Sequence, residues 1–299
     1  MSIVERAIRR MRAESRAAPA PQPVGGLLRG ARERLPSVDA ASAQERSAGR
    51  SQPITLTTES VVNFAPPAGD YIATAWRMHS DPVLTSQLRG LRRTLMEQIA
   101  KAEDVDRAAV VVITSALPGD GKTFSSVAVA RAFAAEQDRQ VVLVDADLAR
   151  RTLTTLFGLA EAPGLADVLA AQQPLPGAIY KTEIGPLWFM PAGRCTTQTA
   201  DFFSSARMDE LLAGLRSWGP EYLFVLDTAP VLAVGETEYA AARADFTVLV
   251  VRSQVTPRGA VEDAVRKLGA QGRLGLISNG NSLGSSGEYN EYAKSYGER

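Results

Sequence analysis

Val110-Val111-Val112-Ile113-Thr114 leads directly into Ser115-Ala116-Leu117-Pro118-Gly119-Asp120-Gly121-Lys122-Thr123. A buried apolar run, a glycine-containing loop and a Lys-Thr pair at the expected start of a helix are typical of a phosphate-binding loop. Gly119 and Gly121 let the backbone turn its N–H groups toward phosphate oxygens, and the helix N-terminus adds a partial positive charge. The strict pattern has glycine where this chain has Ala116, but the order of strand, loop and helix agrees with a phosphate-binding loop.

This loop predicts binding of ATP with Mg²⁺. We expect Lys122 to reach the β- and γ-phosphates and Thr123 to offer its hydroxyl to the metal. The predicted nucleotide contacts are Pro118, Gly119, Asp120, Gly121, Lys122, Thr123 and Phe124.

Three acids follow buried apolar runs. Asp145 and Asp147 come after Val141–Val144, and Asp227 comes after Tyr222–Leu226. The carboxyl ends of parallel strands meet at one edge of a sheet, so these acids should lie beside Lys122. A lone acid here is more often a helix cap, but three in one sheet favour catalysis. We predict catalytic roles for Lys122 and the three acids. Thr123, Asp145 and Asp227 would hold the metal, and Asp145 or Asp147 would position it or accept a hydroxyl proton.

The surrounding pattern predicts an α/β fold of the P-loop NTPase type. Continuous apolar runs are typical of parallel strands covered on both faces, and helical stretches between them are long enough for crossovers. The expected sheet is therefore doubly wound and mostly parallel, with helices on both faces. Its strands are Ala108–Thr114, Gln140–Asp145, Leu187–Met190, Tyr222–Asp227, Phe246–Arg252 and Leu274–Ser278, and its helices include Phe124–Glu136, Ala206–Ser217 and Ala260–Leu268.

Composition excludes several other classes of protein. The 299 residues carry 33 basic and 33 acidic side chains, so no general attraction to nucleic acid is expected. One cysteine and one histidine argue against a disulfide framework and a multi-histidine metal site. No stretch has the ~20 apolar residues that span a bilayer, and no secretory signal precedes the domain. We expect a soluble, cytoplasmic protein.

Four segments are expected along the chain. Residues 1–17 form a basic amphipathic helix that contacts a membrane surface, docks on a partner or stays solvated. Residues 18–69 form a largely disordered linker rich in proline, alanine and arginine, 70–283 a P-loop kinase domain, and 284–299 a flexible tail. Within the domain, Asn279 is either an adenine contact or a turn residue. Arg150 and Arg151 have two possible roles. They bind phosphate or a C-terminal tail that enters the site, or they are ordinary surface arginines.

The tail contains three of the seven tyrosines, at Tyr289, Tyr292 and Tyr296. Alone, this is a polar end in which tyrosine recurs. With a nucleotide site upstream, the three side chains are candidate phosphate acceptors.

Together these features resemble the bacterial tyrosine kinases (BY-kinases) of polysaccharide export, over roughly Ser80 to the C-terminus. The matching motifs are Ser115–Thr123, Val141–Arg151, Leu226–Pro230 and the tyrosine cluster. A soluble chain with a basic helix and linker most resembles the exosortase-associated (XrtA-type) autokinases. The resemblance implies ATP-dependent phosphorylation of the tail in trans within a homo-oligomer, regulating exopolysaccharide or capsule export. It also implies activation by a membrane chain-length-determinant protein of the Wzz/Wzc-N type, at the inner face of the inner membrane.

The chain departs from this family in two places. Arg89 and Arg92 match a ring-assembly motif whose acidic position is Ser86 here, and Thr228-Ala229-Pro230 keeps one proline of two. Two other functions stay open. A ParA/MinD-like positioning ATPase would carry lysine and glycine at Leu117 and Pro118. An ATP-binding regulator of a membrane polysaccharide co-polymerase would bind nucleotide without catalysis.

Overall fold

The computed structural model describes residues 71–77, 82–101, 106–135, 138–194, 206–269 and 273–280. Every described residue belongs to one compact unit. The segments predicted at residues 1–17, 18–69 and 284–299 lie outside the described residues, so the domain boundaries stay predictions.

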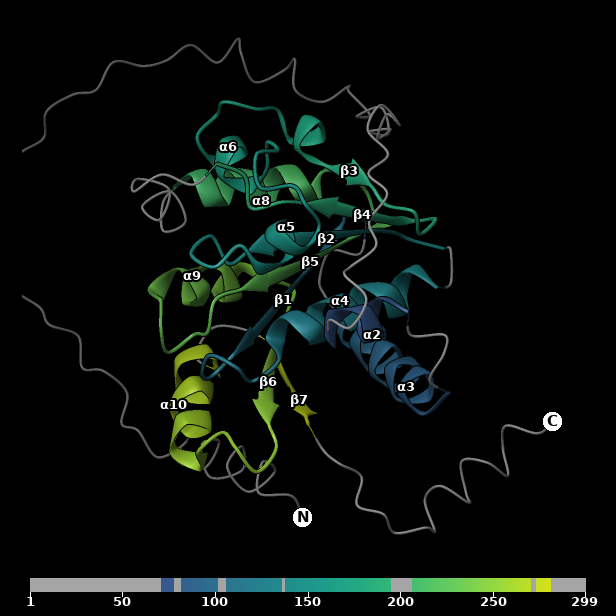
Figure 1. The fold of residues 1–299 in the computed structure, drawn as a ribbon. Helices are drawn as coiled ribbons and strands as arrows, with labels where there is room; N and C mark the ends of the chain where they lie inside the picture. Colours follow the sequence, from purple (N-terminus) through teal and green to yellow (C-terminus); the bar gives the residue numbers. More distant parts are fainter. Residues whose placement is uncertain are drawn as a thin grey trace, which may run out of the picture. The chain divides into compact units, whose positions relative to one another are not determined.

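A seven-stranded sheet forms the centre of this unit, in the order β3-β4-β2-β5-β1-β6-β7 (Figure 1). All neighbouring strands are parallel except β3, which runs antiparallel to β4. The strands are β1 (Ala109–Ser115), β2 (Gln140–Ala146), β3 (Tyr180–Lys181), β4 (Leu187–Met190), β5 (Tyr222–Thr228), β6 (Phe246–Arg252) and β7 (Leu274–Asn279).

The middle of the sheet is buried on both faces. Every residue of β1 and β5 is buried, including the aligned pair Val111 and Val225. This explains why these strands are continuous apolar runs instead of alternating ones. The loop after β1 therefore lies between the ends of β5 and β6, the two strands that pair with β1.

Helix α4 (Lys122–Ala134) follows that loop and packs across β1, β2 and β5. All but one of its residues are buried, because α2 (Tyr71–Trp76) and α3 (Pro82–Ile99) cover its outer side (Figure 1). A helix buried on all sides is expected where neighbours enclose it, and the small and apolar run Val127–Ala130 fits this enclosure. The nucleotide loop therefore leads into a helix in the interior of the domain.

The remaining helices complete the layered fold. On the other side of the sheet in Figure 1 lie α8 (Ala206–Arg216), α9 (Gly235–Arg243) and α10 (Arg258–Gly269). The elements between β2 and β3 are short: α5 (Thr152–Leu156), α6 (Leu165–Leu169) and the 3-10 turn η2 (Leu175–Ala178). Helices thus cover both faces, and the predicted doubly wound, mostly parallel fold is confirmed.

All six predicted strands are present, and their ends shift by at most one residue. The short strand β3 and the short helices α2, α5, α6 and α9 were not predicted. Among the helices described, none combines the length and apolarity needed to cross a bilayer.

Candidate active site

The loop between β1 and α4 has the backbone expected of a phosphate cradle. Gly119 and Gly121 have φ angles of 89° and 95°, in the left-handed region that favours glycine. Gly121 directly precedes the first residue of α4, so the helix N-terminus points into the loop. Pro118 and Gly119 are exposed at its tip, whereas Thr123 is buried at its base and Phe124 is half-buried. The tip of the loop is therefore accessible to a ligand, whereas its base is enclosed.

Lys122 extends from the start of α4 toward the ends of the strands. Its side-chain nitrogen lies 2.9 Å from Asp147 Oδ2, and the residue is only 8% exposed. Burial lowers the pKa of Lys122, but the charges of Asp227, Asp147 and Asp145 outweigh it, so the pKa is raised. The ammonium is therefore held in its charged form at the centre of an acidic group.

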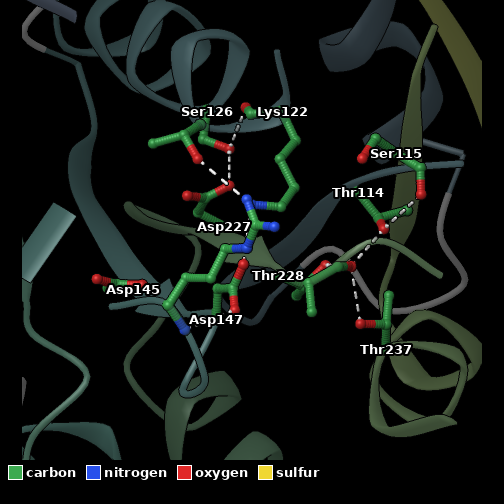
Figure 2. Close-up of polar contacts among 12 residues, drawn as sticks. Thr114, Ser115, Lys122, Ser126, Asp145, Asp147, Asp227, Thr228 and Thr237 are labelled. Carbon is green, nitrogen blue, oxygen red and sulfur yellow. Dashed lines mark hydrogen bonds and ion pairs between the residues drawn. The ribbon is translucent and has the colours of Figure 1, made fainter. Parts of the chain in front are cut away.

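Asp227, on β5, is fully buried beneath α4. Its Oδ1 accepts a 3.0 Å hydrogen bond from Ser126 Oγ, and Figure 2 shows the two side chains beside Lys122. Burial raises the pKa of Asp227 to about 6, although the positive charge of Lys122 acts against this. Ser126 lies four residues beyond Lys122, one helical turn along α4, and its role was not predicted from the sequence.

Asp145, on β2, is also fully buried. Its Oδ2 accepts hydrogen bonds of 2.8 Å from both the backbone N and the Oγ1 of Thr154, in the middle of α5. Burial and the neighbouring charge of Asp227 raise the pKa of Asp145 to about 7. One oxygen of this carboxylate is therefore used to hold α5 in place.

The second oxygen of each carboxylate is different. Asp145 Oδ1 and Asp227 Oδ2 are buried and have no hydrogen-bond partner. Unpartnered buried carboxylate oxygens are costly unless a cation reaches them, so they fit an oxygen-binding ion such as Mg²⁺. In the described part of the chain, no three His, Cys, Asp or Glu side chains would hold a metal by themselves. Thr123 Oγ1, which accepts from Lys122 Nζ at 3.4 Å, is a further oxygen at the site.

A set of polar contacts holds the loop from the side of β6 and β7. Asp120 Oδ2 accepts from Leu117 N at 2.9 Å, and Asp120 Oδ1 accepts from Thr256 Oγ1 at 2.7 Å. Asn279 Nδ2 donates to the backbone oxygen of Asp120 at 2.9 Å. Thr256, whose role was not predicted, follows β6 and comes near the loop only in the folded chain.

Asn279 was predicted to contact adenine or to lie in a turn. It is the last residue of β7, and its amide nitrogen is occupied by the loop. A Cβ added at Gly121 would lie 1.9 Å from that nitrogen. Asn279 therefore packs where only glycine leaves room, and its contact with adenine stays a prediction.

The end of β5 is tied to the end of β1 by threonines. Thr114 Oγ1 and Thr237 Oγ1 both donate to the backbone oxygen of Ala229, at 2.8 and 2.9 Å (Figure 2). Thr228 Oγ1 donates to Ile113 O at 3.0 Å. These contacts keep the strand carrying Asp227 in line with the strand that enters the loop.

Arg150 and Arg151 have different surroundings. Arg151 has a φ of 50°, and its guanidinium donates to Ala160 O. Arg150 is exposed, and its backbone N donates to Asp147 O. Its side chain makes no polar contact with another described residue. Of the two, Arg150 is the one available to a ligand, while Tyr289, Tyr292 and Tyr296 lie outside the described residues.

The chain is 33% identical over 201 residues to EpsB of Ralstonia solanacearum, covering 67% of this chain and 26% of EpsB. It is 32% identical over 202 residues to the tyrosine-protein kinase YwqD of Bacillus subtilis, covering 67% of this chain and 84% of YwqD. No protein-family model matches the chain.

Among solved structures, the kinase domain of VpsO aligns with a TM-score of 0.57 and 30% identity, over 70% of this chain and 97% of that domain. The chain thus spans most of YwqD but about a quarter of the length of EpsB.

Proposed function

The chain belongs to the bacterial tyrosine-protein kinases, and we propose that it is an ATP-dependent tyrosine autokinase that phosphorylates its own C-terminal tyrosine cluster. The acceptors are Tyr289, Tyr292 and Tyr296, each supplied by a neighbouring molecule. The reaction forms a bond between the tyrosine oxygen and the γ-phosphorus of ATP, and breaks the bond from that phosphorus to the β–γ bridging oxygen.

One observation carries this proposal. The loop around Lys122 and the carboxylates of Asp145, Asp147 and Asp227 meet at a single edge of the sheet, although they come from three separate strands and a helix. Phosphoryl transfer needs mainly positioning and neutralisation of charge. This edge supplies both, with a fixed cation, backbone donors and unpartnered carboxylate oxygens.

The residues divide the work as follows. The loop from Pro118 to Thr123 binds the phosphates through its backbone N–H groups. Lys122 exchanges its contact with Asp147 for the γ-phosphate and neutralises it. Asp147 is then free to accept the proton of the attacking tyrosine, and Arg150 binds the incoming acidic tail.

Thr123, Asp145 and Asp227 would hold Mg²⁺, which would withdraw negative charge from the phosphates. Thr154 and Ser126 keep the two carboxylates in place.

The proposal also includes a biological setting. We place the protein at the cytoplasmic face of the inner membrane, as an XrtA-type member that regulates the polymerisation and export of an exopolysaccharide or capsule. Its activator is a membrane chain-length-determinant protein, and residues 1–17 add a peripheral membrane contact. Three phosphotyrosines would add roughly −4.5 to −6 charges to the tail, so phosphorylation would repel the tail from an acidic site and loosen the oligomer.

The direct test is phosphotyrosine formation on the purified full chain given Mg²⁺ and ATP. We expect the signal to map to the tail and to fall at least about a hundredfold in Lys122→Met, which removes the fixed cation. The combined change Tyr289→Phe, Tyr292→Phe and Tyr296→Phe should leave ATP binding intact and remove most of the phosphotyrosine.

Tyr239→Phe is the matched control, because Tyr239 is also a tyrosine near the surface but bonds to Asp209. Clear ATP binding with no phosphotyrosine, even with the partner's cytosolic segment added, would reject the kinase assignment.

A further inference from the structure

A second pocket lies away from the nucleotide site, between α3, the end of α4 and the start of β2. It has a volume of about 410 Å³ and is lined by Arg89, Gly90, Arg92, Arg93, Met96, Phe133, Asp138 and Arg139. Arg139 directly precedes β2, whereas Asp145 stands near the other end of that strand. A strand of seven residues spans about 23 Å, so the two sites are separate.

The charge of this pocket is strongly positive. Four arginines face one aspartate, although the chain as a whole has equal numbers of basic and acidic side chains. Within the described residues, Arg89, Arg93 and Arg139 form no ion pair or hydrogen bond through their side chains. Arg89 and Arg93 are exposed and Arg139 is half-buried, so their guanidinium groups are accessible. Such a cluster matches a ligand with several negative oxygens.

The pocket also has an apolar wall. Phe133, at the end of α4, is 2% exposed, and Met96 on α3 is half-buried beside it. A free phosphate ion has no apolar surface to pack against such a wall, whereas the ring of a phosphorylated aromatic side chain does. The ring would pack on Met96, above the buried Phe133, while the phosphate meets the arginines.

Gly90 is the unusual residue of the lining. It lies in the middle of α3, where glycine is one of the least favourable helix formers. A Cβ at this position would have no atom within 4 Å, so packing inside the domain does not require glycine. The missing side chain instead leaves space at the pocket. Arg89 directly precedes this position, and Arg93 lies about one helical turn farther along α3.

We propose that this pocket binds a phosphotyrosine of the chain's own C-terminal tail. The proposal rests on the proposed function, which creates the phosphotyrosine. It adds a step after the transfer of phosphate. The phosphorylated tail leaves the neighbour's active site and is then retained on its own domain.

The distances allow this within one molecule. Arg273, directly before β7, donates to Gln98 O on α3 at 2.9 Å, so the start of β7 lies against the end of α3. The six residues of β7 span about 20 Å. Tyr289 follows Gly280 by nine residues, which reach about 30 Å when extended, and Tyr292 and Tyr296 reach farther. A tethered ligand also has a high effective concentration, which favours the chain's own tail over a free copy.

The test uses a synthetic peptide of residues 284–299, phosphorylated chemically on all three tyrosines, and its unphosphorylated twin. The receptor is the full chain with Tyr289→Phe, Tyr292→Phe and Tyr296→Phe, so that its own tail does not compete. We expect the phosphopeptide to bind at least about tenfold more tightly than the twin, as charge-assisted contacts to arginine require. Because the phosphates are made by synthesis, this result does not depend on the chain being a kinase.

Three variants locate the site. The double change Arg89→Gln and Arg139→Gln should weaken phosphopeptide binding about tenfold or more. Gly90→Leu should weaken it by filling the pocket while keeping or raising the melting temperature. Arg266→Gln, which removes an exposed arginine of α10, is the matched control and should change nothing.

Several results would overturn the proposal. Equal affinity for the two peptides, an equal loss in Arg266→Gln, or competition by inorganic phosphate as strong as by the phosphopeptide would each do so. For the natural chain phosphorylated on its tail, we expect weak binding of added phosphopeptide and a monomer in sedimentation. A dimer that depends on Arg89 would refute capture within one molecule.

Discussion

Asp145 on β2 and Asp227 on β5 are aligned partners on adjacent parallel strands, and both are 0% exposed. Neighbouring strands are about 4.8 Å apart, so two carboxylates share one buried location. In each carboxylate, one oxygen accepts a hydrogen bond from a threonine or serine hydroxyl and the other has no hydrogen-bond partner. The arrangement favours a proton or a cation at this site, and Lys122 supplies only one positive charge.

The first prediction concerns pH. Folding raises the pKa of Asp145 from 3.8 to about 7 and that of Asp227 to about 6, chiefly through burial. The folded state therefore binds these protons more tightly than the unfolded state. Their stabilising effect is complete below pH 3.8 and is lost as pH rises through 6 to 7. Asp145→Asn is neutral at every pH and still accepts from Thr154. In EDTA without nucleotide, it should melt several degrees above the parent at pH 8, and by a clearly smaller margin at pH 5.

Asp263→Asn is the control for this measurement, because the Asp263 side chain is 58% exposed. It should show no difference that grows with pH. A gain for Asp145→Asn that is the same at pH 5 and pH 8 would contradict the buried-pair account.

The second prediction concerns Gly121 and Asn279. Gly121→Ala forces a Cβ into left-handed backbone, which costs about 1–2 kcal/mol, and into the Asn279 amide. We expect lower stability and weaker ATP binding. Asn279→Ala removes a contact in the parent but relieves the clash in the variant, so the two effects should not add. Urea unfolding of both single variants and the double variant measures this coupling, and strict additivity would argue against the packing described.

The third prediction concerns Thr256. Thr256→Val removes the 2.7 Å hydrogen bond to Asp120 Oδ1 while keeping the shape of the side chain. A hydrogen bond to a charged group contributes about 1.5–3 kcal/mol, so we expect ATP affinity to fall about tenfold with the fold intact. Thr94→Val, at an exposed helical threonine bonded to Gly90 O, is the control for calorimetric titration with ATP. Unchanged affinity in Thr256→Val would show that the loop holds its shape without this contact.

The fourth prediction separates two adjacent arginines. Arg150→Gln should slow phosphorylation of the tail several-fold with little change in melting temperature, because its side chain makes no polar contact with another described residue. Arg151→Gln should lower the melting temperature by a few degrees, because it loses its contact with Ala160 O. Initial rates and thermal unfolding of both variants make the comparison. A slower rate in Arg151→Gln with a lower melting temperature in Arg150→Gln would instead assign the tail contact to Arg151 and the structural role to Arg150.

The long strands were predictable because each is a continuous apolar run that the sheet buries on both faces. The helices α5 and α6 were not predictable, because each has only five residues, too few to show the periodicity of a helix. Strand β3 is only two residues long and depends on pairing with β4. Helix α2 is another case, because it is stabilised by covering α4, a partner far along the chain.

The amino-acid sequence by itself determined which residue types stand at which strand ends: glycines and Lys122 after β1, and acids in β2 and β5. Those choices follow local rules of backbone freedom and burial, and they predict the fold and the place of the site. Only the tertiary structure decided the pairing of Lys122 with Asp147, the anchoring of Asp145 by Thr154, and the contacts of Asp120 with Thr256 and Asn279. Most of these contacts join residues far apart in the chain, and their geometry depends on strand order and register, which no local pattern encodes.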